Sequence, residues 1–157
     1  MIAVRLQLAG LLQHSALGPF RIGMRIEEFR AITNDLVGWY QIGSGASKAE
    51  AVDIGPVEFL FWKGADTESQ CLNLITIDFS SRESPPSGFV IDLGHFKGGM
   101  SVAEFQRAAP TNISVRLDKT KPFSEVYQVG PSCLAYFEED AGNVSLRVIE
   151  CVSPNRR

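Results

Sequence analysis

The order of apolar and polar residues predicts a chain made mostly of short strands. In the segment 56–62, Val57, Phe59 and Phe61 alternate with Glu58, Leu60 and Trp62. This period of two residues is typical of a strand with one apolar face. Similar short runs, bounded by Gly, Pro, Ser and Asp, recur along the chain. We expect strands at 37–42, 50–54, 56–62 and 71–79, and again at 112–117, 124–129, 132–138 and 143–152.

Two segments have the period of a helix instead. Ser101 and Glu104 form a Ser-x-x-Glu capping box, which satisfies the free amides that open a helix. Apolar residues at helical spacing follow around Phe105, and Pro110 ends the pattern. The segment 26–33 has the same apolar stripe without a capping side chain. Both helices are expected to be about nine or ten residues long.

The two helical segments belong to an internal repeat. Residues 17–32 (LGPFRIGMRIEEFRAI) match residues 93–108 (LGHFKGGMSVAEFQRA) at seven of sixteen positions, with an offset of 76. Chance would give about one identity in such a window. The repeat predicts that the chain contains two similar structural units.

Downstream of the helices, the match of 54–56 with 129–131 sets an offset of 75. A rival register matches 40–43 with 127–130. Under the first register, one face of the sheet is apolar and the other carries large aromatics. The core face then holds Phe59/Leu134 and Phe61/Tyr136, and the opposite face holds Glu58/Cys133, Leu60/Ala135 and Trp62/Phe137.

These patterns predict an α+β fold of two tandem repeats. Each repeat is expected to be a short helix region packed on an antiparallel sheet of about four strands. Residues 1–82 form the first repeat with an N-terminal extension, and residues 83–157 form the second. Residues 80–88, rich in Ser, Pro and Gly, separate them. The apolar N-terminus is expected to be a strand or short helix of the fold.

Net charge, apolar runs and the number of cysteines exclude several classes of protein. The formal net charge of −3 argues against binding of nucleic acid by charge alone. No apolar run is long enough to insert into a membrane, and the N-terminus lacks the basic region of a secretion signal, so a cytoplasmic location is expected. Three widely spaced cysteines predict thiols, although a Cys133–Cys151 disulfide stays open if the last two strands pair.

No cofactor is expected, and the sequence contains no hydrolase, metalloprotease or Ser-x-x-Lys motif. We therefore expect a protein that is not an enzyme. An enzyme with its site between the repeats is the weaker alternative, and it would use residues that break the duplication, such as His95 where the first repeat has Pro19.

The candidate site is a binding surface for another protein. Its aromatic anchors are Trp62, Phe137, Trp39 and Tyr127, accompanied by Glu58. Its acidic rim lies in the last turn of each repeat: Asp66 and Glu68 in the first, and Glu138, Glu139 and Asp140 in the second. Acid there would steer a partner with a basic cleft. The alternative is that stacked repeats bury the aromatics and that the acidic turns are simply solvated.

The two helix openings, at residues 20–29 and 96–105, resemble a known family. A Phe-x-x-Gly-Met-helix start used twice about 76 residues apart is similar to the tandem β-lactamase inhibitory proteins, and to small outer-membrane assembly lipoproteins that share the domain. The resemblance implies units with helices on a four-stranded sheet and a sheet face that grips another protein. Those inhibitors are secreted and carry a disulfide in each unit, a pattern that this chain lacks.

We therefore expect a protein-binding module that occludes a partner, in the manner of an immunity protein or an inhibitor of a bacterial toxin or enzyme. The second hypothesis is a small-molecule or envelope-associated binding protein that uses the cleft between the repeats. The sequence does not specify the oligomeric state.

Overall fold

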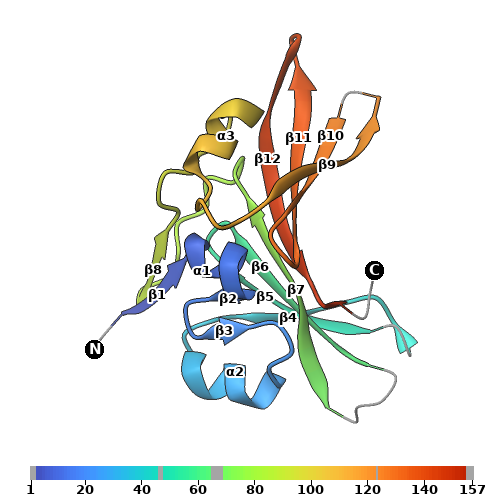
Figure 1. Ribbon diagram of the computed structural model, residues 1–157. Helices are drawn as coiled ribbons and strands as arrows, with labels where there is room; N and C mark the ends of the chain where they lie inside the picture. The colour runs from blue at the N-terminus through green and yellow to red at the C-terminus, as the bar shows by residue number, and fades with distance from the viewer. Residues whose placement is uncertain (1–2, 46–47, 65–68, 123, 155–157) are drawn as a thin grey trace.

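The computed structural model describes residues 3–45, 48–64, 69–122 and 124–154. Its main feature is an eight-stranded antiparallel sheet with the strand order β4-β5-β6-β7-β12-β11-β10-β9 (Figure 1). The first half of this sheet contains β4 (Trp39–Ile42), β5 (Ala49–Ile54), β6 (Val57–Lys63) and β7 (Gln70–Asp78). The second half contains β9 (Val115–Lys121), β10 (Ser124–Val129), β11 (Cys133–Asp140) and β12 (Asn143–Val152). The expected mixture of helices with antiparallel strands is confirmed.

The two expected helices form where the pattern places them. They are α2 (Ile26–Thr33) and α3 (Val102–Ala108). The capping box of α3 is present, since the Glu104 amide donates to Ser101 Oγ at 3.1 Å and the Ser101 amide donates to Glu104 Oε1 at 3.2 Å. The start of α2 has no side-chain cap, because Arg25 has no oxygen to offer the free amides.

The two halves of the sheet are joined edge to edge. Strands β7 and β12 pair in antiparallel register, from Leu74 opposite Val152 to Asp78 opposite Val148. The alternative in which two sheets stack face to face is therefore wrong. In the part of the chain that the structure describes, one face of this continuous sheet has no second sheet packed on it.

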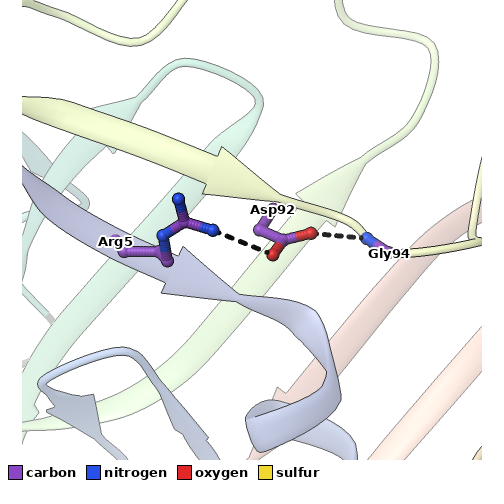
Figure 2. Close-up of polar contacts among 3 residues, drawn as sticks. All are labelled: Arg5, Asp92 and Gly94. Carbon is purple, nitrogen blue, oxygen red and sulfur yellow. Dashed lines mark hydrogen bonds and ion pairs between the residues drawn. The ribbon is translucent and has the colours of Figure 1, made fainter.

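The N-terminal segment connects the two halves on the covered side. It contains β1 (Val4–Gln7) and α1 (Leu8–His14), so both expected forms of the N-terminus occur. Strand β1 pairs in parallel with β8 (Phe89–Asp92), a strand that the sequence reasoning missed. Figure 2 shows the polar contact at this pair: Arg5 Nη1 lies 3.3 Å from Asp92 Oδ2, and the Gly94 amide donates to Asp92 Oδ1 at 3.0 Å.

The same segment also reaches the second half of the sheet. Gly130 has φ +61°, and a β-carbon there would collide with the carbonyl oxygen of Leu12. The thiol of Cys133 donates to the carbonyl of Leu11 at 3.4 Å. The N-terminal segment around Leu11 and Leu12 thus packs against the turn before β11 and against the first residue of β11.

The buried core lies between the sheet and the elements that cover it: α1, α2, α3, the β1–β8 pair and the short hairpin of β2 (Ala16–Leu17) and β3 (Phe20–Arg21) (Figure 1). Under the first half, Phe20 and Phe29 stack with ring centroids 4.1 Å apart. Under the second half, Phe105 meets Phe137 edge to face at 5.5 Å. One connected cluster of apolar residues extends through both halves.

Candidate functional site

Strand alternation gives the eight-stranded sheet two different faces. On the covered face, side chains such as Phe59, Phe61 and Ile149 are fully buried. On the other side, which we call the open face, most residues of the central strands are half-buried or exposed, although Ala51 and Val126 of the flanking strands are buried there. The central strands contribute the following residues to the open face: Glu58, Leu60, Trp62, Leu74, Thr76, Leu134, Tyr136, Val148, Glu150 and Val152.

The open face is hollowed where the two halves of the sheet meet. The hollow has a volume of about 620 Å³. Its apolar walls are Trp62 and Leu74 from the first half and Leu134 and Val152 from the second. Its polar lining residues are Asp118, Lys119, Gln128 and Glu150. The hollow is thus lined by both apolar and polar side chains, and both halves of the chain contribute to it.

Trp62 and Glu58 lie on the open face as predicted. Trp62 lines the hollow and stands opposite Cys71 of β7. Glu58 lies nearer the outer strands, where its Oε2 accepts from the hydroxyl of Tyr40 at 2.9 Å. The same hydroxyl lies 2.9 Å from Asp53 Oδ1, so that one phenol proton faces two carboxylates. Burial raises the pKa of Tyr40 far above its ordinary value, and the hydrogen bonds to the two carboxylates raise it further.

The predicted face of Phe137 is wrong. Phe137 is fully buried in the core, as are Cys133 and Ala135 of the same strand, and Tyr136 is on the open face. The cause is one extra residue in a turn: Ile54 pairs with Val57 across a two-residue turn, whereas Val129 pairs with Cys133 across a three-residue turn.

The extra residue changes the offset between equivalent strand positions from 75 to 76. Because side chains alternate with period two, that slip moves every residue of β11 to the other face. With the offset of 76, the position equivalent to Trp62 is Glu138, and the residue of β11 that lines the hollow is Leu134.

Trp39 and Tyr127 belong to the covered side of the sheet. Trp39 meets Phe61 at 5.4 Å between ring centroids, and the guanidinium of Arg30 lies 4.6 Å above the Trp39 ring. Tyr127 meets Phe137 edge to face at 5.4 Å. Both rings are half-buried at the margins of the core, so they do not extend the surface that contains Trp62.

The acidic turn of the second half is exposed. Glu138, Glu139 and Asp140 end β11 at the tip of the hairpin with β12. Glu138 pairs with the exposed Arg147 at 3.6 Å, a contact of little energetic value at such a site. Asp66 and Glu68, the predicted acids of the first half, lie outside the described residues.

A tyrosine–carboxylate pair on the open face was not predicted. The hydroxyl of Tyr136 donates to Glu150 Oε1 at 3.0 Å. Desolvation, the charge of Glu150 and the hydrogen bond to it together raise the pKa of Tyr136 to about 12, with desolvation the largest cause. The signal was present in β12, where Val148, Glu150 and Val152 alternate with buried Ile149, but only the correct register of β11 connects it to Tyr136.

The described residues contain no group of three or more histidine, cysteine or carboxylate side chains arranged to hold a metal ion. Of the helices in the same residues, none has the length and apolar character needed to span a bilayer. Because no protein-family model, curated protein or solved structure matches this chain, the chemistry of the open face is the basis for assigning a function.

Proposed function

We propose that the chain is a protein-binding module, not an enzyme, that occludes a partner with its open face. In this proposal it acts in the cytoplasm as an immunity protein or an inhibitor of a bacterial toxin or enzyme. The observation that carries the proposal is the hollow of about 620 Å³ around Trp62, Leu74, Leu134 and Val152. A tryptophan beside aliphatic side chains, with polar groups in the same lining, has the composition of a binding hot spot.

The charges on the open face favour a basic partner. The carboxylates of Asp53, Glu58 and Glu150 lie along it, and Glu138 follows at the hairpin tip. The basic residue in the lining of the hollow is Lys119, which lies on the edge strand β9. A protruding segment with an apolar residue between lysines or arginines would fill the hollow and pair with the carboxylates around it.

We also infer that the sheet consists of two repeats of one unit, and the hydrogen bonds at the two helix openings support this. The Leu72 amide donates to the Met24 carbonyl at 2.8 Å, and the Leu146 amide donates to the Met100 carbonyl at 2.9 Å. The amide of the glycine before each methionine returns the bond, to Leu72 at 2.7 Å and to Leu146 at 3.1 Å. The same reciprocal pair thus ties each helix opening to the last strand of its half.

The strand irregularities support the same inference. The β6–β7 ladder shifts register between Leu60 and Phe61, and the β11–β12 ladder shifts between Tyr136 and Phe137. These sites are 76 residues apart, which is also the offset of the helix openings. The resemblance to tandem inhibitory proteins implies a sheet face that grips another protein, and the open face would serve as that face in this proposal.

The experiment compares three forms of the tagged chain as bait in extracts of the native cells. Leu134→Arg places a charge in the wall of the hollow, and Val90→Arg makes the same kind of change at an exposed apolar residue of β8, on the covered side. We expect a partner that wild type and Val90→Arg retain and Leu134→Arg loses. Thermal unfolding of both variants verifies that they are folded. A partner retained equally by all three forms binds elsewhere and would contradict the proposal.

The acidic rim is tested on the same partner. We expect neutralisation of the tip to weaken association and reduce its salt dependence with little change in folding stability. The rim variant combines Glu138→Gln, Glu139→Gln and Asp140→Asn, and the charge-matched control combines Glu27→Gln, Asp35→Asn and Glu83→Gln at exposed positions. Equal affinity and salt dependence in the two triple variants would remove the rim from the site.

A small molecule in the same hollow is the second candidate, favoured by its location between the two halves of the sheet. A compound library screened by thermal shift separates the two candidates. A ligand that raises the melting temperature of the wild type and not of Leu134→Arg, with no protein captured, would support this candidate instead.

A further inference from the structure

Two cysteines lie directly opposite each other in the buried core. Cys133 begins β11 and Cys151 is near the end of β12, and the two are register partners in the antiparallel ladder. Both side chains are on the covered face and neither has any exposed surface. No disulfide joins them in this structure.

The hydrogen-bond pattern places the two backbones close together at this pair. The Val152 amide donates to the Ser132 carbonyl at 3.2 Å, so the adjacent pair 132/152 is of the hydrogen-bonded type. In an antiparallel ladder the types alternate, which makes Cys133/Cys151 a non-hydrogen-bonded pair. Such pairs have Cα atoms about 4.5 Å apart and side chains directed close to each other. A disulfide accepts Cα separations of about 4.4–6.8 Å.

We propose that Cys133 and Cys151 are a disulfide site that closes when the chain folds in the presence of a small-molecule disulfide. The thiolate of one cysteine attacks glutathione disulfide, forms a mixed disulfide and releases one glutathione thiolate. The thiolate of the second cysteine then attacks the protein sulfur and releases the second glutathione. The protein loses two protons and two electrons, and one glutathione disulfide becomes two thiols.

Burial determines when this exchange can occur. In the folded protein both sulfurs are covered, so glutathione disulfide reaches them only when β11 and β12 separate. The exchange is therefore expected in the unfolded or partly folded chain. Loss of the Cys133 thiol proton leaves the Leu11 carbonyl satisfied, because the Ser15 amide also donates to it, at 3.1 Å.

Cys71 provides an internal control. It stands opposite Trp62 on β6 rather than opposite another cysteine, and it is only half-buried. Its thiol donates to the Ser69 carbonyl at 3.8 Å. Exchange at Cys71 is expected to stop at a mixed disulfide with glutathione, which remains reversible by added thiol.

The test refolds the wild-type chain from denaturant in a glutathione redox buffer and maps disulfides by mass spectrometry of non-reduced peptides. We expect one intramolecular disulfide, Cys133–Cys151, and a melting temperature raised by roughly 6–12 °C over the reduced form, since the bond closes a loop of about 18 residues. Cys71→Ser should retain both effects, and Cys151→Ala should lose both. The folded reduced protein should acquire the bond at least about tenfold more slowly in the same buffer.

A folded product of oxidative refolding that retains thiols at Cys133 and Cys151 would overturn the inference. A disulfide that involves Cys71 would overturn it equally. The peptide map uses the wild-type chain, so the result does not depend on whether a core variant folds. It is also independent of the open face, and the binding proposal can fail without affecting it.

Discussion

Adjacent residues 136 and 137 offer a direct test of which face of β11 is buried. Phe137 has no exposed surface and packs edge to face against Phe105 and Tyr127. Truncation to alanine removes its transfer free energy, about 2–3 kcal/mol, and leaves a cavity that the surrounding rings fill only in part. We expect Phe137→Ala to lower the free energy of unfolding by about 3–5 kcal/mol.

Tyr136 is half-buried on the open face, where its main specific contact is the hydrogen bond to Glu150. We expect Tyr136→Ala to cost about 1–2 kcal/mol. The two losses are measured by urea unfolding monitored by far-UV circular dichroism. With a slope of about 2 kcal/mol per molar urea, the midpoint falls by roughly 1.5–2.5 M for Phe137→Ala and by less than about 1 M for Tyr136→Ala.

The order of the two losses is the decisive result. If Tyr136→Ala cost more than Phe137→Ala, the face assignment of β11 would be refuted, and with it the wall of the hollow that Leu134 forms. A domain is stable by only about 5–15 kcal/mol, so a milder variant at the same position is measured beside Phe137→Ala. Phe137→Leu keeps most of the volume, and its expected loss is about 1 kcal/mol. An unchanged urea midpoint for Phe137→Leu would contradict the burial of Phe137.

Three further changes test other parts of the structure. Ser101→Ala should lower the free energy of unfolding by about 1 kcal/mol, because it removes the cap of α3. Arg25→Ser should raise it by about 0.5–1 kcal/mol, because it creates the equivalent cap on α2. A lower free energy of unfolding for Arg25→Ser, measured in urea, would contradict this. The raised pKa of Tyr136, about 12, means that the folded protein holds this proton more tightly than the unfolded chain, so stability should fall as pH rises from 10 to 12. Glu150→Gln should lower that pKa, as followed by tyrosinate absorbance, and an unchanged titration would exclude Glu150 as a cause. Gly130→Ala should cost more than about 2 kcal/mol in urea unfolding, because its β-carbon meets the Leu12 carbonyl at positive φ; a loss within about 0.5 kcal/mol would place the N-terminal segment elsewhere.

The elements that sequence predicted well are those with local causes. The capping box at Ser101 and the stop at Pro110 define α3, and the prediction of 124–129 matches β10 at both ends. Left-handed turn residues also act locally: Ala141 and Gly142 have φ +52° and +84° and close the β11–β12 hairpin at the expected position.

The elements that sequence missed depend on partners far along the chain. Strand β8 exists because Val4–Gln7 lies beside it, and no period within residues 89–92 indicates that contact. The β7–β12 join likewise depends on pairing between residues 70 or more positions apart. Such pairings are decided by how the whole core closes, which local patterns do not encode.

The register of β11 shows why a match between two sequence segments does not by itself predict which face of the following strand is buried. The best local match, Ile54-Gly55-Pro56 with Val129-Gly130-Pro131, is correct at the turns. Ser132 then lengthens the second turn by one residue, and the faces of the following strand exchange. As a result, Phe137 is not part of the proposed binding surface, whereas Leu134 and Tyr136 are.

The open face stays available because the covering elements are all used on the other side. The helices and the β1–β8 pair bury one face of the sheet. Because β7 and β12 join the two halves edge to edge, the second face of one half does not pack against the other half. Apolar side chains around Trp62 thus remain only partly covered: Leu74, Leu134 and Val152. Exposed apolar area is unfavourable in water, and folding alone does not require it here. A surface retained at such a cost is expected where something binds, which is why Leu134→Arg, and not a change in the core, is the variant that separates binding from folding.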